Sequence, residues 1–196
     1  MNRPTKTAVF GAALLLTATA AAASAAASSD SGSSRTGASH PGASALPAQA
    51  REAAALTGEA KLYRSAGDDI TFSFDAHLAA KDKADPTKAT GTFEWSHYLN
   101  GEGARAQAKV DCLLTGGKVA VVSGVITSSD LPGAKGKRVG ITVHDLGHRD
   151  RLGYSWASTG TPVETKGLPK CVGSAPFEKV KKGTGDFSVT PWQPDL

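Results

Sequence analysis

From residue 59 onward, hydrophobic and polar residues alternate with a period of two, which is the pattern of half-buried strands. In the clearest run, Ile70, Phe72 and Phe74 would share one face, with Thr71 and Ser73 on the other. Similar alternation occupies 93–99, 106–114, 139–143, 152–156 and 187–189. The run 119–126 is almost continuously apolar, and we expect it to be a central strand covered on both faces.

With a first strand over 60–64, these runs predict about eight antiparallel strands. Gly116-Gly117 lies between two of them and suits the positive φ values of a tight hairpin turn. No run of helical period interrupts the strands, which excludes parallel β-α-β units. We therefore predict an all-β fold in the form of a small closed barrel, because closure leaves no strand edge open to aggregation. A β-sandwich is the alternative.

The N-terminal part of the sequence has the features of an export signal. Arg3 and Lys6 precede an apolar run over 8–23, and small residues that suit signal cleavage follow it. We predict a signal peptide over 1–27 and secretion to the extracellular space or the cell envelope. An uncleaved membrane anchor is the alternative.

The next segment, 28–58, is rich in Ala, Ser and Gly and predicts a flexible spacer. It cannot bury enough apolar surface to offset the entropy lost when a chain becomes ordered. Its part over 47–56 has good helix formers behind Pro47, which favours a short, marginal helix. A single all-β domain would then occupy 59–196.

The charge of the chain gives no support for a polyanionic partner. The precursor carries 22 basic and 18 acidic residues, and signal cleavage removes Arg3 and Lys6, so the net charge falls from +4 to +2. That charge is too small to predict binding to nucleic acid or, after cleavage, to an anionic membrane. We expect the partner to be a small ligand or an extracellular protein, and we expect no cofactor.

Cys112 and Cys171 are the only two cysteines in the chain. An exported protein meets an oxidising compartment, where an even number of cysteines usually pairs, and we predict a disulfide between them. The alternative is a nucleophilic Cys112. Cys112 would share the apolar face of its predicted strand with Val110 and Leu114, and such a position disfavours a reactive thiolate.

Two stretches give the chain a resemblance to a known group of proteins. The run VDCLLTGGKVAVVSG over 110–124 joins a cysteine-bearing strand, a glycine turn and an Ala/Val-rich strand. The run VGITVHDLG over 139–147 is followed by Asp150. From about Ala60, the chain resembles small exported actinobacterial β-domain proteins, some of which carry the label repetin. The resemblance implies export and an all-β domain, and it implies no activity and no catalytic residue.

The densest group of polar residues contains His144, Asp145, His148 and Asp150. Histidine and carboxylate side chains can together bind zinc or another divalent metal. Two histidines at this spacing converge on one ion on a helix, however, and Gly147 indicates a loop. We therefore predict a polar turn without a metal, in which Asp145 and Asp150 accept hydrogen bonds from nearby backbone amides.

His97 is a further candidate for a polar site, because it would share a strand face with Phe93 and Trp95. The chain carries none of the CxxC, HExxH or GxGxxG motifs, and no catalytic residue is assigned. We expect a non-enzymatic, secreted domain that binds a ligand or a partner. One alternative is a small extracellular enzyme whose site lies in the barrel mouth, at His97 or at His144 and Asp145. Another is a secreted hydrolase inhibitor. Polar groups converging on a histidine in a cavity would favour the enzyme, and a filled interior would favour a binding protein.

Overall fold

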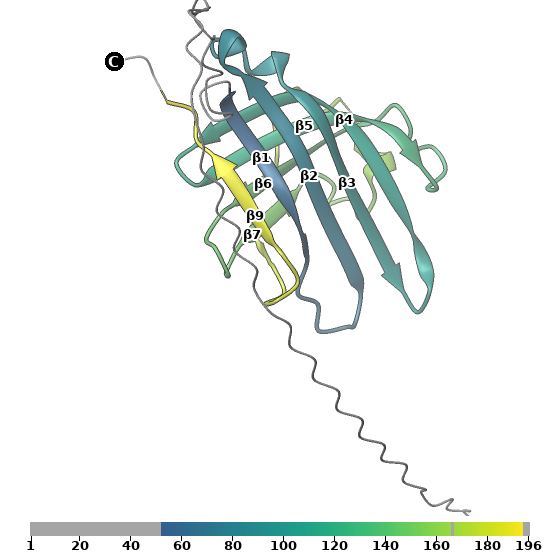
Figure 1. The fold of residues 1–196 in the computed structure, drawn as a ribbon. Helices are drawn as coiled ribbons and strands as arrows, with labels where there is room; N and C mark the ends of the chain where they lie inside the picture. The colour runs from purple at the N-terminus through teal and green to yellow at the C-terminus, as the bar shows by residue number, and fades with distance from the viewer. Residues whose placement is uncertain (1–51, 166, 194–196) are drawn as a thin grey trace, which may run out of the picture. The chain divides into compact units, whose positions relative to one another are not determined.

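The computed structural model describes residues 52–165 and 167–193, which form nine antiparallel strands of one strongly curled, half-barrel sheet (Figure 1). The strands are β1 (Glu52–Lys61), β2 (Asp69–Ala79), β3 (Thr90–Leu99), β4 (Glu102–Gly116), β5 (Val119–Ser129), β6 (Arg138–His144), β7 (Arg151–Tyr154), β8 (Glu178–Lys179) and β9 (Asp186–Thr190). The predicted all-β class is confirmed. The described residues contain no α-helix, only single 3-10 turns at Ala80–Asp82 (η2), Pro86–Lys88 (η3) and Pro162–Glu164 (η4).

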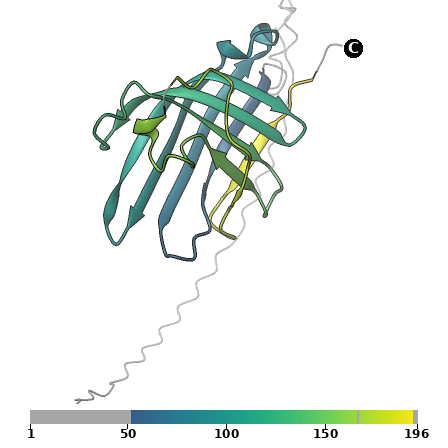
Figure 2. The ribbon, with the colours of Figure 1, turned by 180° about the vertical axis from the view of Figure 1, so that it is seen from behind.

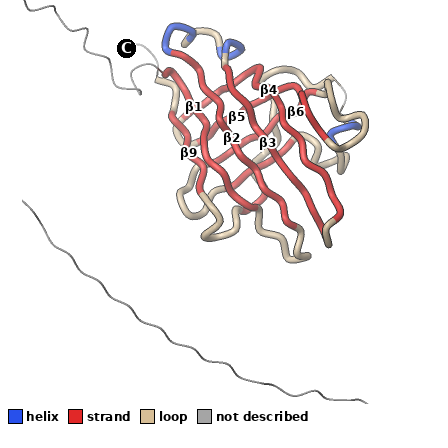
Figure 3. The backbone as a smooth tube through the Cα atoms, turned by 45° about the vertical axis from the view of Figure 1, so that its right-hand side comes forward, coloured by secondary structure: helices blue, strands red, loops and turns tan. Residues whose placement is uncertain are grey.

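The order of strands in the sheet is β8-β7-β6-β5-β4-β3-β2-β1-β9. The chain thus runs as a simple meander from β1 to β8, and β9 then pairs with β1 at the other end of the order. In Figures 1 and 3, β9, β1, β2 and β3 run side by side, while β5 and β6 cross behind them. Figure 2 shows these crossing strands from the opposite side. The sheet therefore folds over on itself and encloses an interior.

The interior of the half-barrel is filled by side chains from all parts of the sheet. The largest of those that are completely buried are Phe72, Phe93, Phe187, Leu56, Leu62, Leu78, Leu113, Ile126, Ile141 and Leu152. The ring of Phe74 meets the ring of Phe187 edge-on, with centroids 5.3 Å apart, and lies 6.2 Å from the ring of Phe93. Aromatic contacts therefore join β9 to β2 and β3.

The predicted alternation of faces is correct for β2 and is interrupted in β4. In β2 the apolar residues from Ile70 to Ala76 are all buried. In β4, Leu113 is 1% exposed and Leu114 is 43% exposed, so the predicted faces of these two residues are wrong. A register shift between Val110 and Cys112 marks a β-bulge. One extra residue in the strand exchanges its two faces from that point on.

Strand β1 corrects the expected N-terminal boundary. A helix was expected over 47–56, but the strand starts at Glu52, so the helix is wrong over the described part of that range. The stretch from Ala53 to Leu56 is buried, and β1 lies between β2 and β9 with backbone pairing on both sides. Pairing and burial on this scale outweigh the helix propensity of alanine, which is a weak preference. The sheet thus begins before residue 59.

The remaining strands differ from the predictions in detail. Strand β5 lies between β4 and β6, as expected for a central strand. The predicted strand over 152–156 ends at Tyr154, and Trp156 is buried in the turn that follows. Strand β8 was not predicted, because two residues are too few to show a period. The predicted signal peptide and most of the predicted spacer lie outside the described residues. Nowhere in 52–165 or 167–193 is there a helix long and apolar enough to cross a membrane.

Candidate functional site

The predicted disulfide is confirmed: Cys112 and Cys171 are bonded, with their Cα atoms 5.3 Å apart. Cys112 belongs to β4 and Cys171 to the long connection between β7 and β8, so the bond fastens this connection to the sheet. The connection passes against the backbone of Gly140 and Gly153, where any Cβ atom would collide with one of its carbonyl oxygens. Only glycine allows so close an approach at these two positions.

A polar cluster beside the disulfide was not predicted. The carboxylate of Asp111 accepts hydrogen bonds from Ser123 Oγ and Arg138 Nε, both at 2.7 Å. Ser123 Oγ in turn accepts the backbone N–H of Cys171 at 3.0 Å, and Arg138 Nη1 donates to the carbonyl of Leu168 at 3.2 Å. These groups hold the connection against the sheet, and we assign them a structural role.

The polar turn between β6 and β7 has the predicted backbone hydrogen bonds. Asp150 Oδ1 accepts the N–H of Leu146 at 2.7 Å, and Asp145 Oδ1 accepts the N–H of Gly147 at 3.3 Å. Both carboxylates therefore stabilise the turn locally, as predicted.

The second oxygen of each carboxylate has a partner that sequence reasoning missed. Asp150 Oδ2 accepts the N–H of Phe187 at 2.8 Å, and Asp145 Oδ2 accepts the N–H of Val189 at 3.3 Å. Phe187 and Val189 belong to β9, which among the described strands has a partner on one side only. The two carboxylates thus satisfy N–H groups along the open edge of the sheet, where an unpaired edge invites aggregation.

The two carboxyl groups are affected differently by their surroundings. Burial opposes ionisation of Asp145, but the ammonium group of Lys118 at 3.1 Å, with the N–H groups of Val189 and Gly147, lowers the pKa of Asp145. Burial raises the pKa of Asp150, the backbone amides oppose the rise, and the neighbouring carboxyl of Asp186 adds to it. As the pH falls, Asp150 is therefore protonated at a higher pH than Asp145.

The structure does not assemble the five candidate polar residues into one site. His97 pairs with Ala104 near the start of β4, whereas His144 pairs with Val119, which pairs with Gly116 at the end of β4. His97 therefore lies at the opposite end of β4 from the turn that holds His144, Asp145, His148 and Asp150. His144 is half-buried and His148 is exposed. Within the described residues, no three His, Cys, Asp or Glu side chains are grouped so that they could hold a metal ion.

His97 lies instead on an apolar cavity of about 990 Å³ near the β3–β4 hairpin, hereafter the apolar cavity. Its aromatic wall consists of Phe72, Trp95, Tyr154 and Trp156. The ring of Trp156 lies 4.8 Å from that of Trp95 and 4.9 Å from that of Tyr154, so the rings pack into one cluster. Tyr154 is half-buried, whereas Phe72, Trp95 and Trp156 are buried and show only their edges to the cavity. The wall is assembled from β2, β3, the end of β7 and the turn after it, which come together only because the sheet curls.

The rim of the apolar cavity carries both apolar and polar groups. Leu99 is 43% exposed there, and Leu131 faces it from the connection between β5 and β6. His97 Nε2 lies 3.0 Å from a carboxylate oxygen of Asp68, and the His97 side chain is 56% exposed. Behind the aromatic wall, the hydroxyl of Tyr154 accepts a hydrogen bond from Arg64 at 3.1 Å. Burial raises the pKa of Tyr154, although the charge of Arg64 acts against the rise, so the phenol stays neutral at ordinary pH.

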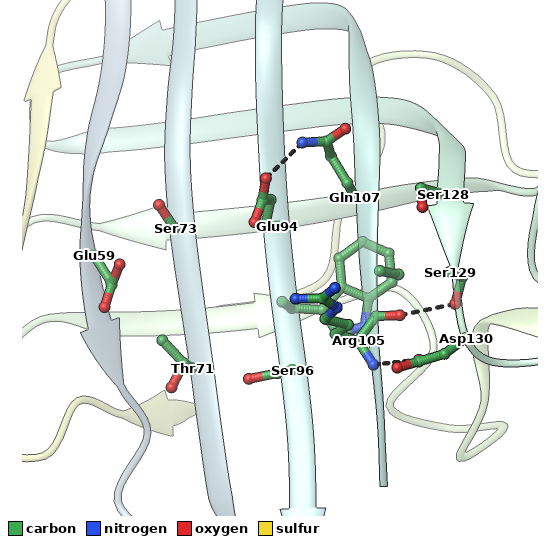
Figure 4. A pocket seen from close by; sticks show the side chains of 12 residues that line it. Glu59, Thr71, Ser73, Glu94, Ser96, Arg105, Gln107, Ser128, Ser129 and Asp130 are labelled. Carbon is green, nitrogen blue, oxygen red and sulfur yellow. Dashed lines mark hydrogen bonds between the residues drawn. The ribbon is translucent and has the colours of Figure 1, made fainter.

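A second cleft, of about 580 Å³, lies on the outward-facing side chains of β1 to β5, hereafter the outer polar cleft (Figure 4). Its floor contains the half-buried hydroxyl side chains of Thr71, Ser73 and Ser96. Exposed charged side chains, among them Glu59 and Arg105, stand around the floor.

Neither cleft was predicted, although part of the signal was present. The alternation in β2 and β3 separated apolar from polar faces, but only the curl of the sheet turns each face into a cleft. His97 was correctly placed on the face of Phe93 and Trp95. The chain matches no family model, no curated protein and no solved structure.

Proposed function

We propose that the protein is a secreted, non-enzymatic binding protein that holds one small, uncharged, hydrophobic molecule in the apolar cavity. The observation that carries the proposal is the aromatic wall of Phe72, Trp95, Tyr154 and Trp156 around a volume of about 990 Å³. Ligand cavities in proteins occupy about 300–1,000 Å³ and are lined mostly by apolar and aromatic side chains with few polar groups.

The arrangement of the rings favours an apolar ligand over a cation. Trp95, Tyr154 and Trp156 pack against one another and offer one surface, whereas a cation-binding cage needs several ring faces directed at one point. A ligand on this surface would also cover Leu99, and removing apolar surface from water contributes about 25 cal/mol per Å². Affinity would therefore come chiefly from the hydrophobic effect.

The small-enzyme alternative is supported by one observation, the His97–Asp68 pair at the rim. A carboxylate that orients a histidine is a common part of a general-base site. Such a site also needs a nucleophile or a second acid within hydrogen-bond reach. Among the described residues, Asp68 is the one hydrogen-bonding partner of the His97 side chain, so the arrangement favours binding over catalysis.

The proposal is tested with N-phenyl-1-naphthylamine, an uncharged apolar dye whose fluorescence rises in an apolar site. We expect saturable binding of one dye per chain, with energy transfer from Trp95 and Trp156. Trp192 lies elsewhere, where its indole N–H donates to the carbonyl of Lys83 at 3.1 Å. A Trp192→Phe variant should therefore keep most of the energy-transfer signal.

Two matched variants test whether the dye binds in the apolar cavity. Leu99→Asp should weaken binding at least about tenfold, because a charge at the rim must then be desolvated. Leu114→Asp is the control, since Leu114 is also 43% exposed but lies outside the cavity. Equal affinity for both variants would overturn the proposal. Hydrolysis of a chromogenic ester that disappears in His97→Gln would favour the enzyme instead.

A further inference from the structure

The register of the strands arranges the side chains of the outer polar cleft in two rows that cross the sheet. The first row runs over β1 to β5 and consists of Glu59, Ser73, Glu94, Gln107 and Ser128, each paired with the next. The second row starts on β1 at Lys61, continues through Thr71, Ser96 and Arg105, and ends at Asp130. The carboxylate of Asp130 accepts the N–H of Arg105 at 2.6 Å. Neighbouring strands lie about 4.8 Å apart, so hydrogen-bonding groups recur at that interval along each row.

Most polar groups of the cleft have no hydrogen-bonding or ion-pair partner among the residues that the structure describes. Glu94 and Gln107 bond to each other. Within the described part of the chain, no hydrogen bond or ion pair engages the hydroxyls of Thr71, Ser73 and Ser96. The carboxylate of Glu59 and the guanidinium of Arg105 likewise have no such partner among the described residues. Figure 4 shows these side chains around the floor of the cleft. The half-buried hydroxyls are therefore available to a ligand that displaces water from the floor.

The chemistry of these groups narrows the class of ligand. Hydroxyls donate and accept, carboxylates accept, and guanidinium and amide groups donate. Among the residues that line the cleft, three carboxylates outnumber the one cation, Arg105, and Lys61 in the second row is already paired with Asp69 at 2.8 Å. This charge balance disfavours nucleic acid and other polyanions. A sugar chain offers hydroxyl groups that both donate and accept on each successive ring. Tyr98 follows Ser96 on the same face of β3, where its ring can cover the apolar side of a sugar.

We propose that the outer polar cleft binds a carbohydrate chain that lies across β1 to β5. The chain follows the two rows, and its hydroxyls exchange hydrogen bonds with Ser73, Ser96, Arg105 and the carboxylates.

The test is a titration of the full chain, labelled with nitrogen-15, followed by amide chemical shifts. The probes are cellohexaose and maltohexaose as neutral sugars, the hexamer of glucosamine as an amine-bearing sugar, and spermine as a polycation without sugar rings. We expect at least one sugar to shift, in saturable fashion, the amides of the two rows at millimolar concentration. Raised salt should leave binding of a neutral sugar nearly unchanged, because no net charge is neutralised.

Two pairs of variants locate the binding. Ser96→Tyr fills the floor, and Thr92→Tyr places the same ring on the same face of β3 outside the cleft. Arg105→Ala removes the guanidinium, and Lys109→Ala removes an exposed cation of β4 outside the cleft. The first member of each pair should weaken sugar binding about tenfold, and the second should not. Sugars that shift no amide of the rows, or Ser96→Tyr with undiminished affinity, would overturn the proposal. Binding of spermine alone, lost in raised salt, would assign the cleft to polycations instead.

Discussion

The carboxylate of Asp150 joins the turn between β6 and β7 to the open edge of β9, and its removal tests this link. In Asp150→Ala, the buried N–H of Phe187 loses its acceptor, which costs about 1–3 kcal/mol. The N–H of Leu146 loses the acceptor that stabilises the turn, at about 1 kcal/mol. We therefore expect Asp150→Ala to lower the free energy of unfolding by about 2–4 kcal/mol. The substitution also removes the cost of desolvating a buried carboxylate, and this gain reduces the loss.

The assay is equilibrium unfolding in urea at neutral pH, followed by circular dichroism. Asp69→Ala is the control: Asp69 forms an exposed ion pair with Lys61 at 2.8 Å, and its loss should cost less than about 1 kcal/mol. Amide hydrogen exchange provides a local measurement, since the amide of Phe187 should exchange much faster in Asp150→Ala than in the wild type. A loss below about 0.5 kcal/mol, or an equally protected Phe187 amide, would refute the reasoning.

The stabilities of the wild type and Asp150→Ala should also depend differently on pH. Because the pKa of Asp150 is raised in the folded state, the folded protein binds a proton more readily than the unfolded chain does. A group of this kind contributes stability at low pH that is lost as the pH rises through its folded-state pKa. The difference in stability between the wild type and Asp150→Ala should therefore be larger at about pH 4 than at neutral pH.

The remaining predictions concern other parts of the sheet. Asp145→Ala removes a carboxyl whose pKa is lowered in the folded state, and with it the stability that its ionised form contributes. In urea unfolding at a series of pH values, the variant should therefore be less stable than the wild type at neutral pH. This difference should shrink as the pH falls through the folded-state pKa. Leu113→Ala should cost about 2–5 kcal/mol and Leu114→Ala less than about 1 kcal/mol in urea unfolding, and equal costs would contradict the bulge. The double variant Cys112→Ser, Cys171→Ser should lose about 2–4 kcal/mol, and alkylation of native protein should find no free thiol. Protein recovered from the culture medium should begin between Ser24 and Ser29, and retention of Met1 in a membrane fraction would contradict the predicted signal peptide.

The strands predicted correctly are those in which local sequence and tertiary position agree. In β2, large apolar residues from Ile70 to Phe74 alternate with polar ones, and burial follows the same period. In β1, the alanines carry a helix preference, and only pairing with β2 and β9 makes them a strand. Such pairing joins residues distant in sequence, and no local pattern records it.

The candidate sites were predictable to the extent that they depend on nearby residues. The local hydrogen bonds of Asp145 and Asp150 follow from turn chemistry, and they are present. The bonds of the same carboxylates to β9 depend on the curl of the sheet, which the pattern does not contain. The bulge at Val110 could not be predicted from the sequence pattern, because one inserted residue changes the faces of a strand without changing its composition.

The pairing of β9 with β1 has a consequence for how the chain acquires its fold. Leu56 and Val189 are register partners, so a contact between nearly opposite ends of the described chain completes the sheet. Contacts of such long sequence separation slow folding, because the intervening chain must be closed into a loop first. During synthesis, the edge of β1 that pairs with β9 lacks this partner until residue 190 has left the ribosome. The sheet is therefore completed only after β9 has been synthesised. A chain stalled before β9 exposes the free edge of β1 to other chains.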